Sequence, residues 1–286
     1  MRSIKSSCVV AVVLFAGLTA APSLAGTITF SLDVTKYGKV ANSGDQCGPT
    51  STANSFAFLQ NMYPDVYKDD NRIIRDKDGA ITADVAKLRD ALAQGWGDKT
   101  GGRKGMGTTG VQLKEWWASK VTWLEDFAPG KTRYAAQMFN ETNTDGWPKK
   151  EAISPVYPTF KFMWDALNHG AAIELNLIDV PFKNGHAVSL IGMSFDDTNN
   201  DKTWNQGEKI FMKFVDPNDP NGTNADNIQP VELTYDATKG RFEFTWWQDK
   251  GRWYIDSALT ETPVPGPATW LMAAMGVGLC ARRRRG

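Results

Sequence analysis

The sequence predicts an α+β domain in which helical segments precede a set of antiparallel strands. In the first half of the chain, hydrophobic residues recur at three- and four-residue steps, which is typical of amphipathic helices. In the second half, short runs rich in β-branched and aromatic residues are separated by turn residues, as in strands. Because the helical runs and the strand runs are segregated along the chain, we expect an N-terminal helical half packed on a C-terminal antiparallel β-sheet.

Four segments carry the helical periodicity, at residues 49–63, 82–95, 111–120 and 157–170. Pro64 ends the first of them, because proline cannot continue a helix. Thr82 is a suitable N-cap for the second, and Gly95 is a suitable C-terminal stop. Strands are expected at residues 27–35, 171–178, 186–195, 209–215 and 252–259, with a hairpin over 231–247 that turns at Lys239 and Gly240.

The first 25 residues have the pattern of a secretory signal peptide. Arg2 and Lys5 precede the apolar run CVVAVVLFAGL, and the small residues Ser23 and Ala25 stand just before Gly26. We therefore expect an exported protein. Together with the resemblance of the C-terminal segment described next, this implies a location in the periplasm, at the cell surface or in the extracellular matrix of a Gram-negative-type bacterium.

The C-terminal segment 263–286 reads PVPGPATWLMAAMGVGLCARRRRG, with prolines, an apolar run and a cluster of arginines. This layout resembles the PEP-CTERM sorting signal, although Gly266 stands where that motif has glutamate. The resemblance implies an exosortase-type processing partner and transient membrane contact. The apolar run is shorter than the roughly 20 residues that span a bilayer, so a weak membrane tail is the alternative.

The domain between these segments, residues 26–262, is long enough to bury a full core. The formal net charge is zero, so nothing favours a nucleic-acid partner. Cys8 lies in the signal and Cys280 in the tail, so Cys47 is the one thiol of the domain. A single cysteine in an exported protein raises the question of whether it is reactive.

Cys47 stands at the predicted start of the first helix, in the stretch GDQCGPTSTANSF. Backbone N–H groups and the helix dipole stabilise a thiolate at a helix N-terminus. Gly48 is expected to let a substrate approach closely, and Pro49 suits the first turn. The alternative is a small apolar residue with no chemical role.

Two histidines are available as a base. His169 lies at a helix end, where a structural role is expected, whereas His186 opens a strand after Gly185. Asp216 follows the next strand, so it lies near His186 if the two strands are antiparallel neighbours. A carboxylate there would orient the imidazole, although the segment DPND is also a common turn.

The three blocks QCGPTS, GHAVSLIGM and FVDPND resemble the catalytic blocks of papain-like cysteine peptidases, and most closely those of bacteriocin-leader-processing peptidases. The resemblance covers roughly residues 40–220 and is specific only in these blocks. It implies a papain-like fold, with Cys47 as nucleophile, His186 as general base and acid, and Asp216 as the residue that orients the histidine.

The family usually places an oxyanion glutamine about six residues before the cysteine, but position 41 is alanine here. Asn42 and Gln46 are the nearby amides, and neither stands at the usual spacing. The sequence therefore predicts an exported cysteine peptidase acting on a peptide or protein substrate. A catalytically silent binding or structural domain is the alternative, and a transglutaminase- or amidase-like reaction is a third possibility.

The stretch DTNNDKTWNQGE carries oxygen-bearing side chains at the ligand positions of an EF-hand loop, namely Asp197, Asn199, Asp201, Thr203, Asn205 and Glu208. Lys202 occupies the position at which such loops have glycine, and strands rather than helices flank the loop. We expect a structural Ca²⁺ site here, with a plain acidic turn as the alternative. No cofactor is expected for catalysis.

Overall fold

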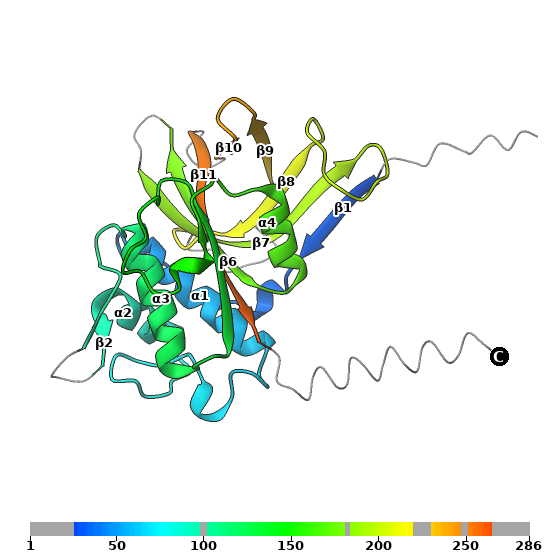
Figure 1. The fold of residues 1–286 in the computed structure, drawn as a ribbon. Coiled ribbons are helices and arrows are strands. Elements are labelled where there is room, and N and C mark those ends of the chain that lie inside the picture. Colours follow the sequence, from blue (N-terminus) through cyan, green and yellow to red (C-terminus); the bar gives the residue numbers. More distant parts are fainter. Residues whose placement is uncertain (1–25, 98–101, 181–183, 220–229, 247–250, 265–286) are drawn as a thin grey trace, which may run out of the picture.

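The computed structural model describes residues 26–264 apart from residues 98–101, 181–183, 220–229 and 247–250. The fold is mostly β, and its centre is a closed six-stranded antiparallel barrel (Figure 1). The barrel strands are β6 (Ala172–Asp179), β7 (Gly185–Asp197), β8 (Ile210–Val215), β9 (Val231–Asp236), β10 (Arg241–Thr245) and β11 (Arg252–Pro263). Each strand pairs with the next, and β6 also pairs with β11, which closes the ring.

Closure depends on the two longest strands. The register of β7 against β8 shifts between Leu190 and Gly192, and that of β11 against β6 shifts between Ile255 and Ser257. Such β-bulges bend and twist a strand, so a sheet can curl back on itself. The same edge of a bent strand can then serve two partners, one along each half of its length.

Additional strands use these second halves. Strand β1 (Gly26–Ser31) pairs with the C-terminal half of β7, and β4 (Thr132–Met138) pairs with the C-terminal half of β11. Strand β5 (Ile153–Ser154) continues the sheet beside β4 in parallel orientation. A separate small hairpin is formed by β2 (Gly95–Trp96) and β3 (Arg103–Lys104).

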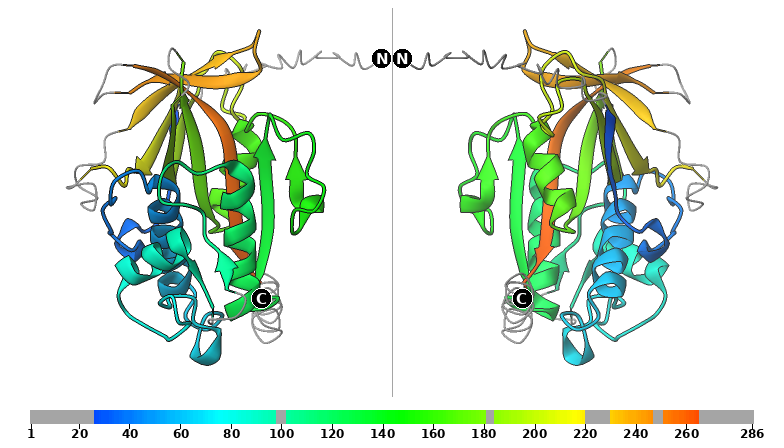
Figure 2. Two further views of the ribbon diagram at one scale, coloured as in Figure 1. Left: turned by 90° about the vertical axis from the view of Figure 1, so that its left-hand side faces the viewer. Right: turned by 90° about the vertical axis from the view of Figure 1, so that its right-hand side faces the viewer.

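The described residues form four α-helices, namely α1 (Cys47–Met62), α2 (Val85–Gln94), α3 (Leu113–Phe127) and α4 (Phe160–Asn168). Figures 1 and 2 show α1, α2 and α3 grouped together at one end of the molecule, with α4 apart from them against the barrel strands. Asp84 caps α2 by accepting from the N–H of Ala86, so the cap lies two residues after the predicted Thr82. None of these helices is both long and apolar enough to cross a bilayer.

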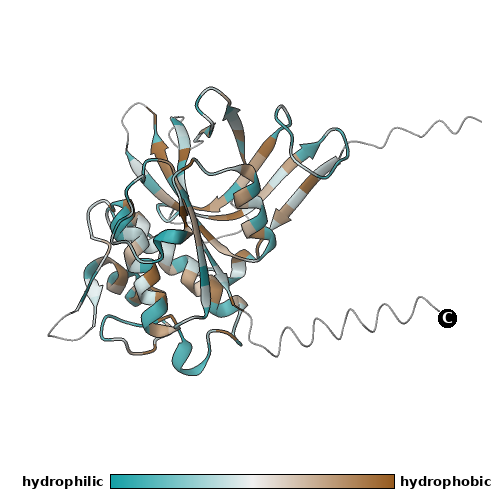
Figure 3. Ribbon diagram, in the orientation of Figure 1, coloured by the Kyte–Doolittle hydropathy of each residue, from teal (hydrophilic) through white to brown (hydrophobic). Residues whose placement is uncertain are grey.

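The apolar residues form two cores on opposite faces of the barrel wall. Alternate residues of β7 enter different cores, because successive side chains of a strand point to opposite faces. Val188 and Leu190 join the barrel interior and α4, whereas Ala187 and Ile191 face the layer of helices α1 to α3. Figure 3 shows hydrophobic residues along the strands and hydrophilic residues in many of the connecting loops.

A charged cluster is buried in the helix-facing core. Lys120 of α3 forms ion pairs with Glu174 of β6 and Glu261 of β11, and all three side chains are fully buried. Burial and the neighbouring Glu174 raise the pKa of Glu261 to about 8, against the opposing attraction of Lys120. This cluster joins a helix to the two strands that close the barrel.

The predicted fold class was wrong. A papain-like α+β fold, with a helical half packed on an antiparallel sheet, does not fit a closed barrel with only four helices among the described residues. The strand positions and the hairpin turn at Gly240, where φ is +68°, are confirmed. The pairing of β6 with β11 and the strand β4 were missed. The predicted signal peptide, residues 1–25, lies outside the described residues. So does most of the predicted sorting segment, residues 263–286, although Pro263 itself belongs to β11.

Candidate active site

Cys47 is the first residue of α1, as predicted, and it is a free, half-buried thiol. Serine side chains fasten this helix to the barrel wall. Ser189 of β7 lies 3.0 Å from the hydroxyl of Ser51 and 3.2 Å from that of Ser55. These contacts fix α1 beside β7, the strand that carries the predicted base.

Gly48 has a different role from the one expected. The residue is buried, and a Cβ at this position would lie 3.0 Å from Cγ2 of Val111. The absence of a side chain therefore allows the start of α1 to pack against the segment before α3, and close approach of a substrate is not what it provides.

His186 and Asp216 lie together as predicted. Strands β7 and β8 are antiparallel neighbours, His186 stands near the start of the first, and Asp216 follows the end of the second. Nε2 of His186 lies 2.7 Å from Oδ1 of Asp216, and both side chains are buried. Because Nε2 faces the carboxylate, Nδ1 is the ring nitrogen left for the cysteine.

The thiol of Cys47 interacts with the imidazole of His186, which places His186 between Cys47 and Asp216. Burial raises the pKa of Cys47, but His186 and the backbone N–H groups of Ala187 and Gly48 outweigh this effect, so that its pKa lies below the ordinary value. Burial would lower the pKa of His186, yet the hydrogen bonds to Asp216 and Cys47 raise it to about 9. Both shifts favour a thiolate beside an imidazolium.

Asn218 is a site residue that the sequence did not reveal. Its backbone N–H donates to Oδ1 of Asp216 across 2.8 Å, and its side-chain Nδ2 lies 3.5 Å from Nδ1 of His186. Asn42 in turn donates from Nδ2 to Oδ1 of Asn218 across 2.7 Å. An amide bridge therefore links the loop before the nucleophile to the loop that carries Asp216.

The two predicted oxyanion amides are placed differently. Asn42 is connected to His186 through Asn218. The side-chain oxygen of Gln46 is buried and has no hydrogen-bond partner among the described residues, and Gln46 does not cap α1 with its side chain. The backbone N–H groups of Gly48 and Ala187 already contact the sulfur of Cys47. Asn42 and its neighbour Asn218 are thus the amides that the structure connects to the triad.

Trp246 covers the imidazole from the barrel side. Its ring centroid lies 5.3 Å from that of His186, with an angle of 54° between the planes. Phe214 and Trp253 pack against the same indole at 5.4 Å and 5.1 Å. An apolar aromatic layer beside the His186–Asp216 pair keeps water away and strengthens their hydrogen bond.

His169 has the structural role that was expected. It is the C-cap residue of α4, and its Nδ1 lies 2.6 Å from the carbonyl oxygen of Asp165. It is exposed and lies at the end of α4, before β6 begins.

The acidic loop between β7 and β8 uses its carboxylates on its own backbone. Asp197 accepts from the N–H groups of Asp201 and Lys202, and Glu208 accepts from Thr198 and Asn205. Lys202 adopts the left-handed conformation with φ of +61°, which the loop requires at this position. Asn199 and Thr203 take part in the same network.

As arranged, this loop does not present a set of carboxylates converging on a cation. No group of three or more His, Cys, Asp or Glu side chains in the described ranges is placed to hold a metal ion. The Ca²⁺ site therefore stays a prediction, and no chemical step depends on it.

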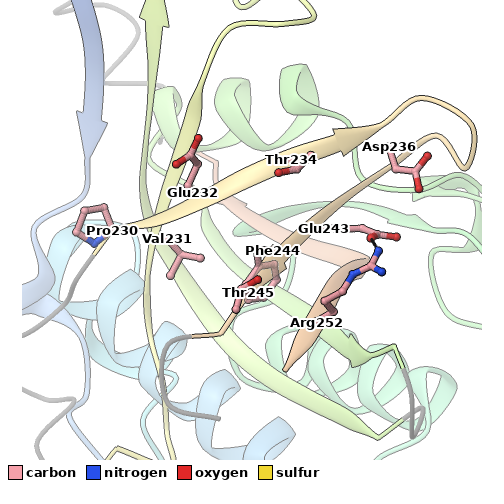
Figure 4. Close-up of a pocket in the computed structure, with 9 residues that line it drawn as sticks. All are labelled: Pro230, Val231, Glu232, Thr234, Asp236, Glu243, Phe244, Thr245 and Arg252. Atoms are coloured by element: carbon pink, nitrogen blue, oxygen red, sulfur yellow. Dashed lines mark hydrogen bonds and ion pairs between the residues drawn. The ribbon is translucent and has the colours of Figure 1, made fainter. Parts of the chain in front are cut away.

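A hollow of about 860 Å³ lies away from the triad, on the outer face of β9, β10 and β11 (Figure 4). Its polar lining includes Glu232 and Thr234 of β9, and the paired Glu243 and Arg252. None of the described residues that line it is a cysteine or a histidine, so it is not the candidate active site.

Comparisons with known proteins add no assignment to this geometry. No family model matches the sequence, and no curated protein matches it. The candidate site is therefore defined by the contacts of its own residues, and of these Cys47, His186 and Asp216 could be found from sequence. Asn218 carried no signal of its own, since the sequence DPND predicts a turn.

Proposed function

We propose that the protein is an exported cysteine peptidase that hydrolyses peptide bonds through Cys47, His186 and Asp216. The observation that carries the proposal is the position of His186, whose Nε2 lies 2.7 Å from Oδ1 of the buried Asp216 and whose imidazole interacts with the Cys47 thiol and lowers its pKa. A catalytic triad is recognised by its geometry and by the roles of its members, and it recurs on unrelated folds. The barrel fold is therefore compatible with this chemistry.

In the first step, the Cys47 thiolate attacks the carbonyl carbon of the scissile bond, and a C–S bond forms. His186 then gives its Nδ1 proton to the leaving amine as the C–N bond breaks, which leaves a thioester on Cys47. In the second step, His186 takes a proton from water, whose oxygen attacks the thioester. The C–S bond breaks, and the thiolate and imidazolium are restored. Asp216 stabilises the imidazolium throughout.

The test is cleavage of casein and of a peptide library under reducing conditions. We expect cleavage by the wild-type chain and loss of cleavage in Cys47→Ser. His186→Ala is expected to abolish cleavage as well, whereas His169→Ala serves as the matched control, because His169 lies outside the site. Absence of cleavage in the wild-type chain, or cleavage that survives Cys47→Ser, would contradict the proposal.

The second candidate is a catalytically silent domain that binds a partner. The observation that favours it is the state of the amides: Asn42 donates to Asn218, and the oxygen of Gln46 is buried without a partner in the described residues. If no side-chain amide serves the oxyanion, about 100- to 1000-fold of rate is lost. Rapid alkylation of Cys47 without any cleavage would identify this state.

We also propose export and C-terminal processing, which rest on the patterns of residues 1–25 and 263–286. The protein recovered from the periplasm or cell surface should have the mass of a chain whose first residue is Gly26. A protein that retains residues 1–25 would contradict export through a cleaved signal.

A further inference from the structure

A second cavity, of about 720 Å³, lies between α4, the acidic loop and the β9–β10 hairpin. We call it the aromatic pocket. Its walls carry three half-buried aromatic side chains, Trp164, Trp204 and Tyr235, and its base is formed by buried phenylalanines, Phe160, Phe195 and Phe242. Its volume falls within the range of small-molecule binding sites.

The aromatic pocket is remote from the triad. Phe195 and His186 lie on the same strand, β7, nine residues apart. At about 3.3 Å per residue, this stretch of strand measures at most roughly 30 Å along its bent path. None of the three triad residues lines the pocket.

The aromatic walls are held in place before any ligand arrives. The indole N–H of Trp204 donates to the carbonyl oxygen of Glu208 across 3.1 Å, within the hydrogen-bonded acidic loop. Trp164 is stacked on Phe160 at 5.5 Å with an angle of 18°, and Phe195 meets its edge at 5.3 Å. Because the rings are already ordered, a ligand that stacks on them causes little further loss of side-chain conformational entropy.

The rim of the pocket is polar and carries both donors and acceptors. Lys161 and Asp165 form an exposed ion pair on α4, and Thr159 lies at the start of the same helix. Gln206 stands on the opposite side, and its amide can donate and accept. The residues at the rim thus suit a ligand with several hydroxyl groups around an apolar body.

We infer that the aromatic pocket binds a pyranose oligosaccharide. A pyranose ring has a face of C–H groups, which the negative faces of Trp and Tyr attract, and a periphery of hydroxyls, which paired donors and acceptors satisfy. A cationic ligand is disfavoured, because Lys161 and Lys202 outnumber Asp165 at the pocket. A purely apolar lipid would leave this polar rim without partners.

A proline-rich peptide fits less well. Such peptides dock into grooves lined by aromatic side chains along an extended helix. Here the plane of Trp204 lies at 76° to that of Tyr235 and at 62° to that of Phe242, so the rings form the walls of a bowl. The geometry favours one pyranose ring of an oligosaccharide inside the bowl over an extended peptide.

The experiment uses the full chain on an array of neutral and acidic pyranose oligosaccharides, followed by titration of tryptophan fluorescence with any oligosaccharide that is bound. We expect binding that weakens by at least about fivefold in Trp204→Ala, because the stacking face is lost. Gln206→Ala tests the rim without touching the core, since Gln206 is exposed, and it should also weaken binding. Phe139→Ala is the control, since Phe139 is an exposed aromatic residue outside the pocket.

Absence of binding to every oligosaccharide would overturn the inference, as would binding that is unchanged in both pocket variants. Binding of a proline-rich decapeptide in the pocket, with no oligosaccharide bound, would also overturn it. Cys47→Ser should bind oligosaccharide as the wild type does, so the outcome is independent of the proposed peptidase activity.

Discussion

Nδ2 of Asn42 donates to Oδ1 of Asn218 across 2.7 Å, although the two residues are 176 positions apart in the chain. The bond joins the segment that leads into Cys47 to the turn that holds Asp216. Since Nδ2 of Asn218 then faces Nδ1 of His186, the amide pair sits where the nucleophile and the base meet.

We predict that Asn218→Ala and Asn42→Ala each lower kcat/KM for a peptide substrate by about 10- to 100-fold, because an oriented amide near the reacting atoms is lost. Alkylation of Cys47 should stay within about twofold of the wild-type rate, because the contact with His186 remains. Asn61→Ala is the matched control, since Asn61 also donates to a neighbouring segment, at the carbonyl of Lys36, but lies at the opposite end of α1 from Cys47. Equal losses in all three variants would show that these amides act only through general stability.

The reactivity of Cys47 should follow an unusual pH dependence. Its lowered pKa predicts rapid labelling by iodoacetamide at neutral pH, where an ordinary thiol is mostly protonated. His186→Ala should move the midpoint of the rate profile to higher pH, because the imidazolium that stabilises the thiolate is lost. Peptide mapping by mass spectrometry separates Cys47 from the other two cysteines.

Asp216→Asn should act through the histidine. It removes the carboxylate that helps to raise the pKa of His186 to about 9, so this pKa should fall toward its ordinary value of 6.5. The change in labelling rate that reports the ionisation of His186 should therefore occur at lower pH than in the wild type. A profile identical to that of the wild type would mean that Asp216 does not control the histidine.

The buried Lys120 cluster predicts a stability effect remote from the site. Lys120→Met leaves two glutamates buried without their cation, and we expect the free energy of unfolding to fall by about 3–5 kcal/mol. Lys104→Met is the control: Lys104 is exposed and pairs with Glu115 at 3.7 Å, so its loss should cost at most about 1 kcal/mol. Urea denaturation measures both values.

The same cluster predicts how stability changes with pH. The pKa of Glu261 is about 8 in the folded protein and 4.5 for the free side chain. Between these values the unfolded chain has lost a proton that the folded protein keeps, so the contribution of Glu261 to stability falls as the pH rises. Glu261→Gln should reduce the pH dependence of the free energy of unfolding between pH 4.5 and 8. An unchanged slope against pH would rule out Glu261 as the origin of this dependence.

Calcium is predicted to raise the melting temperature, because a cation bound by the acidic loop would stabilise only the folded state. Asp201→Asn should remove the effect, and Asp236→Asn is the control, since Asp236 binds turn N–H groups in the same way outside the loop. Equal melting temperatures in chelator and in millimolar calcium would exclude the Ca²⁺ site. The carboxylates would then serve only to accept hydrogen bonds from the backbone of their own loop.

The positions of the three candidate catalytic residues could be predicted because each lies at the end of a regular element. The proline after Gly48 marks the start of α1, and the apolar runs mark the ends of β7 and β8, so the positions of Cys47, His186 and Asp216 follow from local patterns. Asn218 and Trp246 could not be predicted in this way. Asn218 depends on a loop from the other end of the chain, and Trp246 depends on how the barrel curls.

The prediction of the fold class was wrong for a related reason. The residue pattern predicts strands at 171–178 and 252–259, but not that they pair with each other across more than 70 residues of intervening chain. The bulges that bend β7 and β11 have no distinctive residue pattern, since only Gly192 adjoins one of them. Ring closure is a property of pairing, and local hydrophobic patterns do not encode it.

Strand β11 has a consequence for how the molecule is made. It follows every other strand of the barrel in the chain, yet it supplies the partner for both β6 and β10 and the carboxyl group of Glu261 that contacts Lys120. The ring cannot be completed until residues up to Glu261 are available to pair with β6, and long-range pairing of this kind is slow. A shorter chain leaves the edges of β6 and β10 without their barrel partner, so the barrel forms only as the last strand is added.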